Sequence, residues 1–161
     1  MELPNTNSAG RSPEPPPQSL HVLCIDDDEQ ILESLKDSLG FFGHRIKVAS
    51  GGKRGVEMFC TAILKSEPFD VVITDLNMPD LDGYEVTRLI KVESSGTPVI
   101  LLSGLGTNVQ GRGVMSVLVD AVVSKPARMG QLNQLILELV RKTQEQTGGS
   151  QQPGGLRFRT D

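Results

Sequence analysis

The chain has 161 residues, is 37% hydrophobic and 22% charged, and carries a formal net charge of −4 at pH 7. This length allows one domain with a sizeable core, and the scattered basic residues exclude a surface that tracks nucleic-acid phosphates. The acidic, Pro-rich start and the absence of a long apolar run argue against a secretory signal and a membrane span, and two cysteines alone make no zinc site. We expect a cytoplasmic protein without nucleic-acid or membrane partners, in which Cys24 and Cys60 are small buried hydrophobic residues.

The two ends of the chain differ in composition from its middle. Residues 1–19 are rich in Pro, Ser, Asn and Gly, and residues 146–161 read QTGGSQQPGGLRFRTD. Segments with so few apolar residues cannot bury enough surface to offset the entropy that folding removes. The sequence therefore predicts a disordered leader over 1–19, one folded unit over 20–145 and a disordered tail over 146–161.

Five short apolar runs within the folded unit predict β-strands. Four of them are nearly continuous in apolar character, as in strands that helices cover on both faces. These four are HVLCI (21–25), FDVVIT (69–74), TPVILLS (97–103) and DAVVS (120–124). The fifth run, HRIKVA (44–49), alternates between apolar and polar residues, and we expect it to be an outer strand.

Apolar residues at helical spacing predict helices between these strands. The four stripes are Ile31, Leu32, Leu35 and Leu39; Val56, Phe59, Cys60, Ile63 and Leu64; Val86, Leu89 and Ile90; and Leu132, Leu135, Ile136, Leu139 and Val140. Residues 104–118 are rich in glycine, so we expect a weak, mobile helix there. Strict alternation of five strands with five helices predicts an α/β fold with an open, doubly wound parallel sheet, in which ligands bind beyond the carboxyl ends of the strands.

Polar residues follow four of the five predicted strands. Three aspartates, residues 26–28, end the first strand, Asp75 ends the third, Ser103 the fourth, and Lys125 follows the fifth. Crowded carboxylates are unfavourable unless a cation lies among them. Hard carboxylate oxygens with a backbone carbonyl suit Mg²⁺, and a lysine opposite them can pair with a carboxylate or with a phosphate.

Each of these residues also has a simpler interpretation. An acidic run before a helix is usually an N-cap with first-turn charges, and we expect that role for Asp28 and Glu29. Asp82 can cap the next helix in the same way, while Ser103 can be an ordinary strand-end hydroxyl and Lys125 a solvated charge. The convergence of all of them on one edge of the sheet favours a functional site.

Four motifs carry a resemblance to a known family. The segments IDDDEQIL, DVVITDLNMPDLDG, PVILLSG and VVSKP are similar, in the same order, to the receiver domain of response regulators and hybrid histidine kinases. The resemblance covers residues 20–140. It implies a flavodoxin-like (βα)5 sheet with strand order 2-1-3-4-5. It also implies a two-component phosphoacceptor that takes its phosphoryl group from a histidine kinase or a histidine phosphotransfer protein and catalyses no reaction besides its own phosphorylation and hydrolysis.

The resemblance implies a role for each residue that matches a family motif. Asp75 is the expected phosphoacceptor, and Asp26 and Asp27 are expected to hold Mg²⁺ together with the Asp75 carboxylate and the backbone carbonyl of Asn77. Ser103 and Lys125 are the expected catalytic partners of Asp75.

Ser103 is expected to donate a hydrogen bond to a phosphate oxygen, and Gly104 to leave the phosphoryl group an open approach. Lys125 is expected to neutralise the phosphate, and the Lys125–Pro126 bond is cis in the family. The chemistry of such a site is positioning and charge neutralisation.

The chain departs from the family pattern at Val122, where the family has its switch aromatic three residues before the lysine. A valine cannot report phosphorylation by the swing of a ring, so we expect the glycine-rich stretch 104–113 to order instead. The departure leaves open an alternative in which the chain is a receiver-fold interaction module that does not need phosphorylation. The sequence also leaves open whether the chain is a stand-alone receiver or part of a hybrid kinase.

Other families share parts of the pattern. A phosphatase of the haloacid dehalogenase type has the motif Asp-x-Asp-x-Thr/Val, which Asp26 and Asp28 fit but Gln30 does not, and no sequence remains for its cap domain. A calcium loop that begins at Asp75 would have Asp80 in place of the required glycine. A flavodoxin-type cofactor binder would need a Ser/Thr-rich phosphate loop after the first strand, which this chain lacks.

Overall fold

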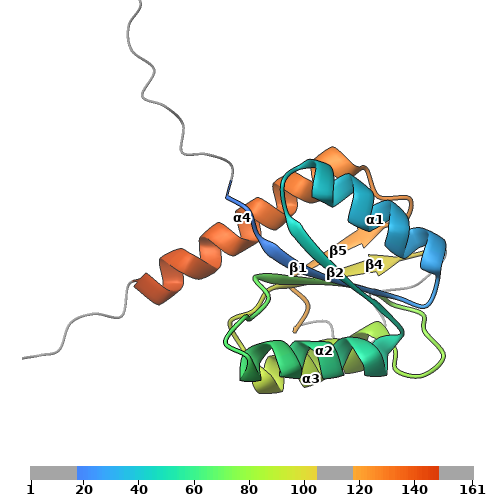
Figure 1. Ribbon diagram of the computed structural model, residues 1–161, viewed down its shortest axis with the longest axis horizontal. Coiled ribbons are helices and arrows are strands. Elements are labelled where there is room, and N and C mark those ends of the chain that lie inside the picture. The colour runs from blue at the N-terminus through green and yellow to red at the C-terminus, as the bar shows by residue number, and fades with distance from the viewer. Residues whose placement is uncertain (1–17, 105–117, 149–161) are drawn as a thin grey trace, which may run out of the picture.

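Five parallel strands form one sheet at the centre of the computed structural model, which describes residues 18–104 and 118–148 (Figure 1). The sheet has the order β2-β1-β3-β4-β5, so the predicted α/β fold and strand order are confirmed. The strands are β1 (His21–Asp26), β2 (Arg45–Ser50), β3 (Val71–Asp75), β4 (Val99–Ser103) and β5 (Ala121–Ser124).

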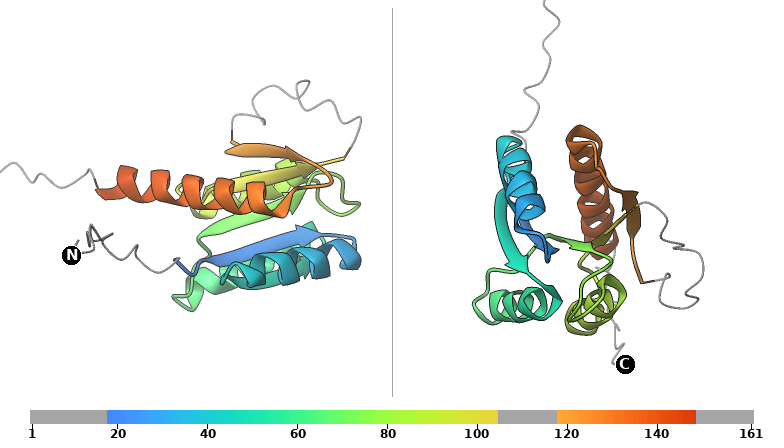
Figure 2. Two further views of the ribbon diagram at one scale, coloured as in Figure 1. Left: turned by 90° about the horizontal axis from the view of Figure 1, so that it is seen from above. Right: turned by 90° about the vertical axis from the view of Figure 1, so that its right-hand side faces the viewer.

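Helices cover the sheet on both faces, as the buried strands require. The helices α1 (Glu29–Phe41) and α4 (Met129–Gly148) lie on one face, and α2 (Gly52–Leu64) and α3 (Gly83–Glu93) lie side by side on the other (Figures 1 and 2). The helix expected over 104–118 falls almost wholly outside the described residues. The last helix continues to Gly148, three residues past residue 145, where the folded unit was predicted to end. Among the described residues, no helix combines the length and apolar character needed to cross a membrane.

The core divides into two clusters because alternate residues of each strand point to opposite faces. The cluster under α1 and α4 contains Leu32, Leu35, Leu39, Leu132, Ile136 and Val140, all from predicted stripes. The cluster under α2 and α3 contains Phe59, Val86 and Ile90. The helical stripes are thus confirmed for their central members.

Three apolar predictions are wrong in detail. Leu64 ends α2 and is exposed, because Ala62 takes the core position at the end of that helix. Cys60 is half-buried, whereas Cys24 is fully buried and burial raises the pKa of its thiol to about 12. The run 120–124 forms an edge strand with alternating exposure. Ala121 and Val123 pack against the cluster under α1 and α4, whereas Val122 points to the other face and is 44% exposed.

The strand register aligns the carboxyl ends of the strands at one edge of the sheet. Asp26 pairs with Ser50, Asp75 with Leu102, and Ser103 with Ser124. Residues that follow these strands therefore share one edge, and the sequence places its polar groups there.

Replacing Ile136 with alanine should lower the free energy of unfolding by about 3 kcal/mol, because truncation leaves a cavity in the core. Ile136 is 0% exposed under α4, whereas its neighbour Leu137 is 37% exposed. The control Leu137→Ala should cost less than about 1 kcal/mol. Urea denaturation followed by circular dichroism measures both values, and equal losses would contradict the orientation of α4.

Candidate functional site

Three carboxylates gather at the carboxyl edge of the sheet. Asp26 ends β1, Asp27 follows it, and Asp75 ends the neighbouring strand β3. One ligand oxygen from each lies within 4.8 Å of the others. The side chains of Asp26 and Asp75 are 1% and 7% exposed, whereas Asp27 is exposed to solvent. The structure therefore brings together the three predicted metal-ligating carboxylates.

A single ammonium group lies between the two buried carboxylates. Lys125 Nζ is 3.0 Å from Asp26 Oδ2 and 2.8 Å from Asp75 Oδ1. The lysine follows β5, where its backbone N–H donates to the Ser103 carbonyl at 2.8 Å and its bond to Pro126 is cis. The side chain, 24% exposed, reaches from the edge strand over β4 to the centre of the sheet.

The charges of the site are unequally stabilised. Burial raises the pKa of Asp26, and the charge of Asp75 adds to this effect, while hydrogen bonds from the Asp28 N–H and from Lys125 only partly oppose it. Burial lowers the pKa of Lys125, but its hydrogen bonds to Asp75 and Asp26 outweigh burial and raise it. The lysine thus stays protonated, while the ionised form of Asp26 remains unfavourable and would gain from a further cation.

The donor set fits Mg²⁺. It consists of hard carboxylate oxygens from Asp26, Asp27 and Asp75. Asp27 is exposed, so the cluster is open to solvent on the side of that residue. The Asn77 carbonyl lies two residues beyond Asp75, and within the described residues no donor engages it. These groups leave room for water molecules or phosphate oxygens, which Mg²⁺ usually retains as ligands.

The loop that follows β3 is held close to the sheet. The Leu76 N–H donates to the Leu102 carbonyl at 3.0 Å, and the Gly83 N–H donates to the Leu76 carbonyl at 2.8 Å. A Cβ atom on Gly83 would lie 2.5 Å from the carbonyl oxygen of Asp75. Glycine at this position therefore lets the start of α3 approach the end of β3.

Two of the predicted helix caps are confirmed. Asp28 Oδ1 accepts hydrogen bonds from the N–H groups of Gln30 at 2.9 Å and Ile31 at 3.4 Å, and Asp82 forms a capping box with Glu85. The carboxylate of Asp28 therefore caps α1 and is not among the clustered ligands. This arrangement argues against a haloacid dehalogenase-type pair formed by Asp26 and Asp28.

Ser103 and Gly104 lie at the same edge. Ser103 is buried at the end of β4, one residue beyond Leu102, the register partner of Asp75. Gly104 is half-buried, and a Cβ atom there would meet no atom of the described residues within 4 Å. The described part of the chain thus leaves open space at Gly104, one residue beyond the carboxyl end of β4.

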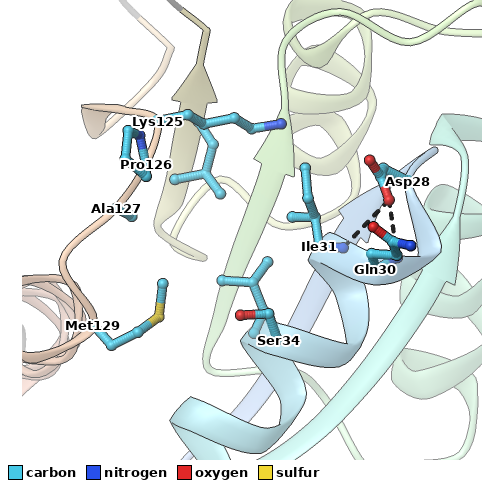
Figure 3. Close-up of a pocket in the computed structure, with 10 residues that line it drawn as sticks. Asp28, Gln30, Ile31, Ser34, Lys125, Pro126, Ala127 and Met129 are labelled. Atoms are coloured by element: carbon cyan, nitrogen blue, oxygen red, sulfur yellow. Dashed lines mark hydrogen bonds between the residues drawn. The ribbon is translucent and has the colours of Figure 1, made fainter.

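A pocket of about 480 Å³ opens beside Lys125 (Figure 3). Pro126, Ala127 and Met129 line one wall, and Ile31 and Ser34 of α1 line the other. The pocket gives an approach to the site from the face of the sheet that carries α1 and α4.

The role of Asp80 was not predicted from the sequence. Its carboxylate accepts hydrogen bonds from the first N–H groups of α2, at Gly52 and Lys53. A signal was present, because Gly51 and Gly52 precede the apolar stripe that starts at Val56, and glycine offers no capping side chain.

The sequence profile described as "Response regulator receiver domain" matches residues 22–137. The chain is 29% identical over 124 residues to "Response regulator MprA" of Mycobacterium leprae, which covers 77% of the chain and 52% of that protein. It is also 29% identical over 127 residues to "Cell cycle response regulator CtrA" of Brucella ovis, covering 77% of the chain and 51% of that protein. The chain spans about half the length of these curated relatives.

Solved structures agree with this match. A response regulator receiver domain protein from Clostridium thermocellum superposes with a TM-score of 0.71 at 28% identity and covers 79% of the chain and 98% of that structure. The response regulator TrrA of Thermotoga maritima, solved in complex with Mg²⁺ and beryllofluoride, gives a TM-score of 0.64 at 27% identity and covers 74% and 98%.

Replacing Lys125 with methionine should lower the free energy of unfolding by about 2–4 kcal/mol at neutral pH, because two buried carboxylates lose their cation. The loss should shrink as the pH falls: with its pKa raised in the folded state, Asp26 binds a proton there before it does in the unfolded chain. Mg²⁺ should restore part of the stability.

The matched control is Lys142→Met, which removes the exposed ion pair of Lys142 with Glu138 at 2.9 Å. It should leave the free energy of unfolding almost unchanged, without the same pH dependence, because solvent screens an exposed ion pair. Equal effects of the two lysine substitutions in urea denaturation would show that Lys125 does not offset the buried charges.

Proposed function

The chain belongs to the response regulator receiver domain family, and we propose that Asp75 accepts its phosphoryl group from the phosphohistidine of a histidine kinase or a histidine phosphotransfer protein. The observation that carries the proposal is the contact of Lys125 with Asp75 at the centre of an acidic cluster. A carboxylate held between a cation and potential metal ligands suits nucleophilic attack on phosphorus.

The transfer exchanges one bond to phosphorus for another. A carboxylate oxygen of Asp75 attacks the phosphorus, the bond from phosphorus to the imidazole nitrogen breaks, and an acyl phosphate forms. Lys125 holds Asp75 Oδ1, and the described residues give the second oxygen of Asp75 no hydrogen bond, which favours that oxygen as the nucleophile.

Several groups would stabilise the charge that develops on the phosphoryl oxygens. The Lys125 ammonium, which contacts the Asp75 carboxylate, can donate a hydrogen bond to the phosphate instead, and the Ser103 hydroxyl can donate another. Asp26, Asp27, Asp75 and the Asn77 carbonyl would hold Mg²⁺, which when bound offsets negative charge on the carboxylates and the phosphoryl oxygens. Gly104 leaves space for the incoming group.

The setting of this reaction follows from the family. We propose a cytoplasmic receiver whose folded unit begins at residue 20 and extends to the end of α4 at Gly148, and whose upstream partner carries the phosphohistidine. As a receiver, the chain acts on no separate substrate and catalyses only its own phosphorylation and dephosphorylation.

Val122 supports a second candidate function, a receiver-fold interaction module that binds its target without phosphorylation. Its side chain lies exposed on the edge strand β5 and is aliphatic. A target that binds the unmodified chain and the Asp75→Asn variant equally well would favour this second candidate.

Replacing Asp75 with asparagine should abolish phosphorylation by phosphoramidate in the presence of Mg²⁺, because the amide is not a nucleophile. Intact mass spectrometry should show one added phosphoryl group on the wild-type chain, labile to base. The control Asp37→Asn, at an exposed position of α1, should be phosphorylated normally. Stable labelling of the Asp75→Asn chain at another residue would contradict the assignment.

Replacing Asp27 with alanine should remove the rise in melting temperature that Mg²⁺ produces in the wild type, since a cation that binds only the folded chain stabilises it. The melting temperature without Mg²⁺ should not fall, because Asp27 is exposed and its loss relieves like-charge crowding. Asp28→Ala is the control: it should lose about 1 kcal/mol of helix capping and keep the Mg²⁺ response. A normal Mg²⁺ response of Asp27→Ala would place the cation elsewhere.

A further inference from the structure

Helix α2 begins without a capping side chain of its own. Its N-cap residue is Gly51, and its first turn contains no acidic residue. Asp80, in the loop between β3 and α3, supplies both the capping hydrogen bonds and the negative charge that this helix end lacks. Its Oδ1 accepts a hydrogen bond from the Gly52 N–H at 3.1 Å, and its Oδ2 accepts one from the Lys53 N–H at 2.9 Å. A carboxylate at this end of the helix also complements the positive end of the helix dipole.

The two glycines allow the loop and the helix to approach closely. Gly51 has φ of +107°, a conformation that favours glycine, and a Cβ atom there would lie 3.2 Å from Asp80 Oδ2. A Cβ atom on Gly52 would lie 2.7 Å from the Cβ and 2.8 Å from the carbonyl oxygen of Leu81. Any side chain at Gly52 would therefore push the loop away from α2.

The same turn is also attached to the metal-ligating edge of the sheet. The Gly51 N–H donates to the carbonyl oxygen of Asp26 at 3.1 Å. Residues 51–53 thus connect the end of β1, which carries Asp26, to the loop after β3, which carries Asn77 and Asp80. The Leu76 N–H still pairs with the Leu102 carbonyl of β4, and residues 51–53 add a second attachment for the part of the loop that follows.

Asp80 is placed to hold the loop rather than to bind the cation. Both of its carboxylate oxygens are engaged by backbone N–H groups, and among the described residues it is not part of the group that could hold a metal ion. Burial alone would raise the pKa of Asp80, but hydrogen bonds from the N–H groups of Lys53, Leu81 and Gly52 outweigh burial and lower it. The attachment therefore persists down to a pH below the ordinary range for an aspartate.

On the basis of the proposed function, we propose that Asp80 is a positioning residue: by attaching the loop over residues 76–82 to the start of α2, it sets where the Asn77 carbonyl lies relative to Asp26 and Asp75. Groups that orient metal ligands from behind affect metal affinity without touching the metal. Loss of the attachment lets the loop move and lowers the affinity for Mg²⁺, while the phosphoacceptor, Lys125 and Ser103 keep their places.

The test compares Asp80→Ala and Asp80→Asn with wild type in the full chain. Asp80→Ala should weaken Mg²⁺ binding roughly tenfold, the lower end of the range for loss of a group that positions metal ligands. The rate of phosphorylation by phosphoramidate should return to near the wild-type value once Mg²⁺ saturates. In ¹H–¹⁵N spectra, the amides of Gly52 and Lys53 should shift upfield and exchange faster with solvent.

Asp80→Asn separates position from charge. Asparagine keeps one acceptor oxygen for the α2 amides but removes the negative charge, so the asparagine variant should bind Mg²⁺ more tightly than the alanine variant. Asp37→Ala, which removes an exposed acid on α1, is the charge control and should bind Mg²⁺ as wild type does.

Three outcomes overturn the positioning role. They are unchanged Mg²⁺ affinity in Asp80→Ala despite altered Gly52 and Lys53 amides, equal losses in the asparagine and alanine variants, and a rate that stays low at saturating Mg²⁺. A wild-type chain that takes no phosphoryl group would instead overturn the proposed function, and the Mg²⁺ titrations of the Asp80 variants would still decide the positioning role.

Discussion

The Lys125 ammonium lies between two buried carboxylates, 3.0 Å from Asp26 and 2.8 Å from Asp75, and the remaining structure serves to keep it there. Without it, two negative charges would face each other at the sheet edge with little water to screen them. One lysine does not fully compensate for the burial of Asp26, whose pKa stays raised, so the site is stable yet favours additional positive charge. A site that favours added positive charge and already holds a lysine ammonium suits the arrival of Mg²⁺ and a phosphoryl group.

The order of the strands determines which residues meet. Because β1 and β3 are neighbours, Asp26 and Asp75 come together although 49 residues separate them, and because β5 lies at the edge, Lys125 must extend over β4. Glycines adjust the surroundings of the site: Gly83 brings α3 against β3, and the pair at 51 and 52 brings α2 against the loop after β3. The loops that carry ligands are thus attached to helices on the face away from Lys125 and its pocket.

Much of this arrangement was predictable from sequence because it depends on periodicity and on the ends of strands. The parallel sheet and the capping by Asp28 follow from local patterns. The strand order that brings Asp26 and Asp27 next to Asp75 was instead implied by the resemblance of four motifs to the receiver family. Burial of Leu64 was mispredicted because a stripe does not show where a helix rises away from the sheet. The role of Asp80 depends on a partner far along the chain, which no local pattern specifies.

We propose that the phosphoryl group resides on Asp75, and chemical mapping on the wild-type chain can locate it. Borohydride reduces an acyl phosphate to an alcohol, so treatment after phosphorylation should convert the modified aspartate to homoserine. Peptide mass spectrometry should then find homoserine at position 75, dependent on both Mg²⁺ and phosphodonor. Homoserine at position 26 or 27, or none in a chain that has gained a phosphoryl group, would contradict the account.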